Sequence, residues 1–140
     1  MAASKTKVFA SFDFDRDRAL RVLFIGQSKL PASPFEVVDY SLKEAAPEAT
    51  WEKKARERIE RADVLVVLLG PKTRRAPGVR KEVAMAKAAG LRRIQLMGYD
   101  YGSRDWAVEG GGRGYRWTWR NLEHLLAPPK RSFAQWFLGE

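Results

Sequence analysis

The sequence predicts an α/β domain in which a doubly wound parallel sheet lies between two layers of helices. Two observations carry this prediction. Stretches typical of strands alternate with stretches typical of amphipathic helices along most of the chain, and right-handed crossovers turn such an alternation into a parallel sheet. The run "DVLVVLLG" at 63–70 is almost uninterruptedly apolar, as expected of a central strand that helices cover on both faces.

The chain opens with a strand and a helix. "KVFASF" at 7–12 combines β-branched, aromatic and small residues, which predicts the first strand. Residues 15–30 follow with apolar side chains at mainly helical spacing. Asp15 or Asp17 stands where an N-cap or first-turn acid is expected.

A second strand and a second helix come next. "FEVVDYS" at 35–41 predicts a short strand. Residues 48–62 are highly charged but carry apolar residues at i, i+4, i+8 and i+11, which predicts a helix with one buried stripe. The stripe consists of Trp51, Ala55, Ile59 and Ala62.

The central strand at 63–70 is followed by a further helix and strand. "VRKEVAMAKAAG" at 79–90 predicts a helix that Gly90 ends. "RRIQLMGYD" at 92–100 predicts the fourth strand. These elements complete the alternation on which the fold class rests.

After the fourth strand the alternation weakens. The stretch at 101–115 is rich in glycine and aromatic residues, and we expect a long loop over or beside the edge of the sheet. Residues 118–128 and 130–140 are expected to form short amphipathic helices. No linker or repeat divides the sequence, so 1–140 is predicted to be one domain with 101–140 as its irregular extension.

The composition excludes several kinds of site. The 140 residues include no cysteine and one histidine, His124, so thiol catalysis, disulfides and a multi-histidine metal centre are excluded. The N-terminus has no signal-peptide pattern, and no apolar run is long enough to span a membrane. These features predict a soluble cytoplasmic protein with no membrane partner.

The net charge of +9 is unevenly distributed. Residues 1–71 carry 12 basic and 11 acidic residues, which nearly cancel. Residues 72–93 carry eight basic residues and a single acidic one, Glu82. The excess therefore belongs to one loop and one helix, where it predicts a surface for an anionic partner.

In a doubly wound sheet, ligands bind beyond the carboxyl ends of the strands. The candidate binding residues near these ends are Ser11, Phe12, Asp13, Asp39, Ser41, Gly70 and Arg74. Glu82 lies in the first turn of the third helix, near the same edge. A carboxylate there can bind ribose hydroxyls while cations bind a pyrophosphate. The alternative is a solvated helix acid that pairs with Arg80, Lys81 or Lys87.

The acids that follow the first strand match no metal or phosphate motif. An EF-hand loop from Asp13 would need Gly and Glu where the chain has Arg18 and Phe24. A receiver-type phosphoacceptor would need Asp after the third strand, where the chain reads Gly-Pro-Lys. GxGxxG after the first strand and a P-loop are also absent. We therefore expect Asp15 and Asp17 to cap or precede the first helix without binding metal.

Five segments carry a resemblance to a known family. They are "KVFASFDFDRD", "VVDYSLKEA", "TWEKKARERIERADVLVVLLGPKT", "VRKEVAMAKAAG" and "YRWTWRNLEHLL". In this order and spacing, over residues 5–127, the chain resembles the TIR-like domain of Thoeris anti-phage proteins, a branch of the Toll/interleukin-1 receptor superfamily.

The resemblance implies a flavodoxin-like fold and an NAD-consuming enzyme. Active members of the family cleave the nicotinamide–ribose bond of NAD, so NAD is the substrate and no cofactor is implied. The product is nicotinamide together with an ADP-ribose or cyclic signal. That signal switches on a downstream effector protein, which is the implied partner.

In that family a helix with the pattern Ser-x-Trp-Val-x-x-Glu supplies the catalytic acid. The resemblance implies that Glu82 is this acid, with Val79 matching three residues earlier. Ala76 stands where the pattern has Ser, and Gly78 stands where it has Trp. We expect a ring from the C-terminal part of the chain to replace the missing one. The candidates are Trp106, Trp117 and Trp119.

Three functions remain open. The first is an NAD nucleosidase or ADP-ribosyl cyclase that signals in anti-phage defence, for which we expect slow turnover or a dependence on self-association. The second is a non-catalytic TIR-like interaction module whose basic helix docks an acidic protein. The third is a nucleic-acid-associated domain that combines the basic segment with Arg104, Arg113 and Arg116, although no nucleic-acid-binding motif is present.

Overall fold

The computed structural model describes residues 5–38, 48–100 and 102–128. Five strands form one parallel sheet in the order β2-β1-β3-β4-β5. The strands are β1 (Thr6–Ser11), β2 (Phe35–Val37), β3 (Val64–Leu69), β4 (Arg92–Met97) and β5 (Arg113–Arg116). The predicted three-layer, doubly wound fold is confirmed.

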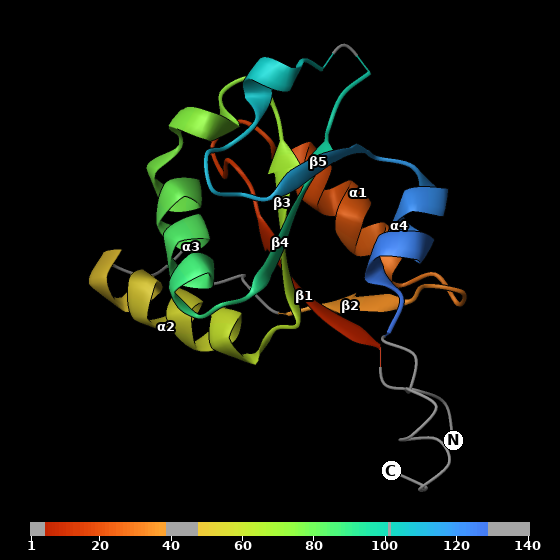
Figure 1. Ribbon diagram of the computed structural model, residues 1–140, viewed down its shortest axis with the longest axis horizontal. Helices are drawn as coiled ribbons and strands as arrows, with labels where there is room; N and C mark the ends of the chain where they lie inside the picture. The colour runs from red at the N-terminus through yellow and green to blue at the C-terminus, as the bar shows by residue number, and fades with distance from the viewer. Residues whose placement is uncertain (1–4, 39–47, 101, 129–140) are drawn as a thin grey trace, which may run out of the picture.

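Two helices cover each face of the sheet (Figure 1). The helices are α1 (Arg18–Ser28), α2 (Glu48–Arg61), α3 (Pro77–Ala88) and α4 (Trp119–Leu126), with short 3-10 helices η2 (Thr73–Arg75) and η3 (Arg104–Trp106). Helices α1 and α4 pack on one face, and α2 and α3 pack on the other.

Alternation along β3 divides the apolar core between the two faces. Every residue of this strand is buried. Val64, Val66 and Leu68 belong to the cluster on the α1 and α4 face. The intervening residues of β3 belong to the cluster on the α2 and α3 face, because successive side chains of a strand point to opposite faces.

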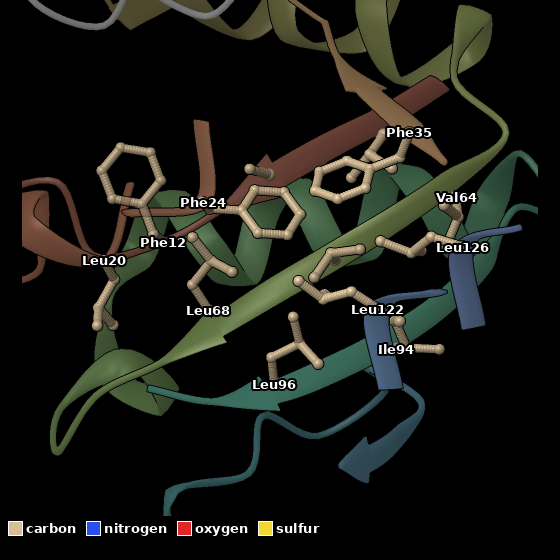
Figure 2. Close-up of a cluster of buried hydrophobic side chains, with 13 residues drawn as sticks. Phe12, Leu20, Phe24, Phe35, Val64, Leu68, Ile94, Leu96, Leu122 and Leu126 are labelled. Carbon is tan, nitrogen blue, oxygen red and sulfur yellow. The ribbon is translucent and has the colours of Figure 1, made fainter. Parts of the chain in front are cut away.

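Figure 2 shows the first of these clusters, in which side chains from α1, α4 and the sheet meet. Phe24 of α1 stacks on Phe35 of β2 with ring centroids 4.8 Å apart. Leu122 and Leu126 of α4 pack into the same cluster. The C-terminal helix therefore completes this layer, as its amphipathic pattern predicts.

The predicted loop at 101–115 is wrong where it reaches the sheet, because β5 begins at Arg113 and pairs with β4 from Ile94 onward. The four residues of β5 include no buried side chain, so the strand lacks the apolar alternation that sequence patterns detect. The chain turns into it through Gly110 and Gly112, both at positive φ. At Gly112 a Cβ would overlap the carbonyl group of Arg93.

The buried Gln95 of β4 fixes the segment that precedes β5. Its side-chain Nε2 donates to the carbonyl oxygens of Val108 and Gly112 at 3.1 and 2.7 Å. Its Oε1 accepts from the backbone N–H of Val108 at 2.7 Å. All hydrogen-bonding groups of this amide are therefore used to hold one loop against the sheet.

The remaining predicted elements differ only at their ends. The helix predicted at 79–90 begins earlier, at Pro77, a favourable first helical position for proline. It ends as predicted before Gly90, whose φ is 68°. The predicted helix at 130–140 lies outside the described residues, and the assignment of 1–140 to one domain stays a prediction. Within the described part of the chain, no helix is long and apolar enough to cross a membrane.

We expect replacement of Gln95 by Leu to destabilise the protein by about 2 kcal/mol or more, because it removes the acceptor of the buried Val108 N–H and the donor to the carbonyl oxygens of Val108 and Gly112. Urea unfolding of both proteins measures this change. The neighbouring substitution Ile94→Val is the control for loss of core volume and should cost about 1 kcal/mol. Equal losses in the two variants would contradict the anchoring role of Gln95.

Candidate functional site

A pocket lies where the order of the strands reverses. Strand β1 has β2 on one side and β3 on the other, and ligands of doubly wound sheets bind in the crevice at such a point. The pocket has a volume of about 670 Å³. Its walls are residues 12–16 after β1, Trp51 of α2, Lys72, residues 75–79 and Lys81.

Glu82 lies beside this pocket and is fully buried, with 0% of its surface exposed. Ser11, at the end of β1, donates a hydrogen bond of 2.7 Å from its Oγ to Oε1 of Glu82. Ser11 and Phe9 share one side of β1, the side that faces α2 and α3. The alternative of a solvated helix acid is therefore wrong for Glu82.

Glu82 does not itself line the pocket. Its neighbours in α3, Val79 and Lys81, do so, and so does Phe12, which directly follows Ser11. The carboxylate therefore lies behind the pocket wall, held between the end of β1 and the first turns of α3.

The mouth of the pocket is rich in cations. Arg16 pairs with Asp13 at 3.2 Å, and Lys81 pairs with Glu52 at 2.6 Å. Lys72 and Arg75 line the same pocket with exposed side chains. This arrangement can attract an anionic ligand.

The three acids after β1 have separate roles. Asp13 is buried and accepts the backbone N–H of Asp15 at Oδ1, at 3.1 Å, while its backbone oxygen accepts from Asp17 at 2.8 Å. Asp13 therefore shapes the turn that forms one wall of the pocket. Asp15 precedes α1 and is exposed, and Asp17 stands at its N-cap position. The predicted positions of Asp15 and Asp17 are confirmed.

The side chain of Asp17 makes no cap hydrogen bond and points into the protein instead, where it is only 2% exposed. Tyr99 donates its hydroxyl to Oδ1 at 2.9 Å, and Thr73 donates its hydroxyl to Oδ2 at 3.3 Å. The hydroxyl of Thr73 in turn accepts the backbone N–H of Gly70 at 2.7 Å. A Cβ at Gly70 would overlap the carboxylate, so glycine is required there.

Burial raises the pKa of Asp17 above its ordinary value. The hydrogen bond from Tyr99 opposes this rise, the negative charge of Asp13 adds to it, and Thr73 and Arg16 oppose it more weakly. Desolvation has the largest effect because it disfavours the charged carboxylate. The sequence placed Asp17 at the helix start but did not predict its inward direction.

Trp51 takes the space beside Gly78. A Cβ on Gly78 would lie 3.6 Å from Cη2 and Cζ2 of this indole, and both residues line the pocket. The expectation that a C-terminal ring lies here is wrong, because Trp106 packs edge-on to Tyr99, and Trp117 and Trp119 pack against the core on the α1 and α4 face. The helical spacing that assigned Trp51 to a buried stripe did not reveal its contact with α3.

The predicted binding residues divide into five groups. Phe12 and Asp13 line the pocket. Ser11 lies behind it with Glu82. Gly70 packs against Asp17, and Arg74 lines a separate cavity next to α3. Asp39 and Ser41 lie outside the described residues.

Among the residues that the structure describes, no group of three or more His, Asp or Glu side chains is arranged to hold a metal ion. The basic residues Arg104, Arg113 and Arg116 line a further cavity near the ends of β3, β4 and β5, together with Tyr99, Tyr115 and Trp117.

Comparison with known proteins gives one family match. A family model described as "Thoeris protein ThsB, TIR-like domain" matches residues 9–101. No curated protein matches the chain significantly. A conserved protein from Enterococcus faecalis V583 has 19% identity and a TM-score of 0.54, with 88% of this chain and 96% of that chain covered.

A second solved structure, the CMP N-glycosidase BcmB of Clostridium botulinum, has 16% identity and a TM-score of 0.48, with 86% of this chain and 94% of that chain covered. At such identities a structural likeness supports the fold alone, as the likeness to the Enterococcus protein does.

We expect Asp17→Asn to change how stability depends on pH. Because the fold raises the pKa of Asp17, the native state binds more protons than the unfolded state between the ordinary pKa of 3.8 and the raised value. Stability from this group is therefore present at acidic pH and is lost as pH rises through that interval. Chemical unfolding at several pH values should show that the free energy of unfolding falls less in the variant than in the parent as pH rises through this interval.

The exposed neighbour Asp15 provides the control for this experiment. Asp15→Asn removes the same charge from the same turn and should leave the pH profile parallel to that of the parent. Parallel profiles for Asp17→Asn and the parent would contradict the burial of the charge.

Proposed function

The chain belongs to the family of TIR-like domains of the Thoeris protein ThsB, and on this basis we propose that it cleaves the bond between nicotinamide and ribose in NAD. The observation that supports the proposal most is the buried carboxylate of Glu82, oriented by Ser11 beside the pocket where the strand order reverses. The released signal acts in anti-phage defence, where an effector protein responds to it.

The chemistry requires stabilisation of positive charge at one carbon atom. The bond from C1′ of the ribose to the nicotinamide nitrogen breaks, and its electron pair leaves with neutral nicotinamide. Glu82 binds the ribose hydroxyls and opposes the positive charge that develops near C1′. Water then adds to C1′ and releases a proton, or an atom of the same ADP-ribose closes a ring.

The pocket walls provide the remaining contacts. Lys72 and Arg75 bind the pyrophosphate, since both are exposed cations of the pocket. Trp51 packs against the nicotinamide or its ribose, because its indole occupies the wall beside Gly78. Glu82 is buried behind that wall, so the reaction requires the neighbouring side chains to move aside when NAD binds.

A non-catalytic interaction module is the second candidate. Ala76 and Gly78 replace two residues of the family pattern, and the hydrogen bond between Ser11 and Glu82 also satisfies a purely structural role. In this reading the basic surface of α3 docks an acidic protein. Cleavage of NAD by the purified chain separates the two candidates.

We expect Glu82→Gln to reduce NAD cleavage by about a hundredfold or more, because an isosteric amide cannot oppose a developing cation. The amide oxygen can still accept from Ser11, so the fold should persist. Nicotinamide release measured by chromatography, together with thermal unfolding, tests both statements. Assays at increasing protein concentration show whether the rate of NAD cleavage depends on self-association.

Glu60→Gln provides the matched control, since Glu60 is an exposed acid of α2, and it should keep the parent rate. A Glu82→Gln variant as fast as the parent would remove Glu82 from the reaction. A parent that cleaves no NAD at any concentration would favour the interaction module.

Moving the aromatic ring from position 51 to position 78 tests the role of Trp51. Trp51→Ala should raise KM for NAD about tenfold, in line with the loss of one stacking contact, whereas Trp51→Phe should keep most of the affinity. Adding Gly78→Trp to Trp51→Ala should restore binding, because the vacated space faces position 78. Initial rates over a range of NAD concentrations measure these effects, and an unchanged KM in Trp51→Ala would exclude the contact.

A further inference from the structure

A second cavity, of about 650 Å³, lies beside another stripe of α3. Residues 80, 83, 84 and 87 follow helical spacing and form one wall. The opposite wall consists of residues 107–110, and residues 74 and 75 of η2 close one end. The pocket described above uses residues 77–79 and 81 of the same helix, so the two cavities lie on different stripes of α3.

Four cations line this second cavity, in which Glu109 is the single acid. The cations are Arg74, Arg75, Arg80 and Lys87. Arg74 donates to the carbonyl oxygen of Pro71 at 3.0 Å. None of these four cations takes part in the ion pairs found between described residues. Among the described lining residues, four cations and one acid therefore give the cavity a positive charge.

The wall opposite α3 is fixed in place. The side chain of Gln95 hydrogen-bonds both the backbone N–H and the backbone carbonyl oxygen of Val108. Gly110 has a φ of 82° and lies close enough to Val83 that a Cβ would be 3.5 Å from that side chain. The cations consequently face a formed concave surface.

We propose that this cavity binds a small phosphate-rich anion, such as the pyrophosphate group of a nucleotide. Three arginines can each donate two parallel hydrogen bonds to phosphate oxygens. The described residues that line the cavity include no aromatic side chain, so recognition depends on the phosphates. The volume matches that of small-molecule sites, and a concave site suits a small anion better than the broad backbone of a duplex.

The proposal is tested by adding inorganic pyrophosphate to the full chain at about 150 mM salt. The NMR chemical shifts of the backbone amides report where it binds. Shifts should include residues 80–87 and 107–110, whether or not the pocket beside Glu82 also responds. The double variant Arg80→Gln with Lys87→Gln should bind about tenfold more weakly or worse, a loss of about 1.4 kcal/mol. Both residues line this cavity and not the pocket beside Glu82.

The control removes the same charge elsewhere. Lys29→Gln with Arg120→Gln replaces two exposed cations of the α1 and α4 layer and should keep the affinity within about threefold. Equal loss of pyrophosphate affinity in both double variants would show that the overall positive charge of the protein, and not this cavity, attracts the anion, and would overturn the proposal. Shifts confined to residues 12–16 and 75–79 would also overturn it.

A duplex DNA provides the remaining arm of the test. Tighter binding of the duplex than of pyrophosphate, lost in the double variant Arg80→Gln with Lys87→Gln, would assign the surface to nucleic acid and overturn the proposal. Pyrophosphate has no glycosidic bond, so none of these results depends on NAD cleavage. Failure here therefore leaves the role proposed for Glu82 untouched.

Discussion

Complete burial of β3 is the constraint on which the rest of this structure depends. All six of its residues are buried, so helices have to cover both faces of the sheet and every connection beside it has to cross over the sheet. The strand order that results reverses next to β1. The polar groups that follow β1 and β3 are thereby gathered at one edge, which is where the pocket forms.

Two of the buried carboxylates at this edge, Glu82 and Asp17, lie on opposite faces of the sheet. Glu82 lies on the α3 side with Ser11, and Asp17 lies on the α1 side with Tyr99 and Thr73. Burial of a charged group is costly unless hydrogen bonds compensate it, and both acids have such bonds. Acids kept in such surroundings are often functional, and here they also tie the ends of the first, third and fourth strands to the helices.

The sequence predicted the fold well because the long-range order follows from local patterns. The apolar run of β3 and the alternation around it determine the layers without knowledge of any contact. Strand β5 was not predicted, because hydrogen bonds to β4 hold it in the sheet while none of its side chains is buried. The pairing of Trp51 with Gly78 and the inward turn of Asp17 also depend on contacts between distant segments, which a single sequence does not encode in its periodicity.

Strand β5 also bears on how copies of this chain can assemble. It is an edge strand of four residues that begins and ends with an exposed arginine, and two glycines at positive φ precede it. Short, charged edges resist the addition of a further strand, because the incoming backbone would bring like charges together. Continuous sheets between copies are therefore disfavoured at this side of the molecule. Copies that associate through the helical layers would leave this edge of the sheet unpaired.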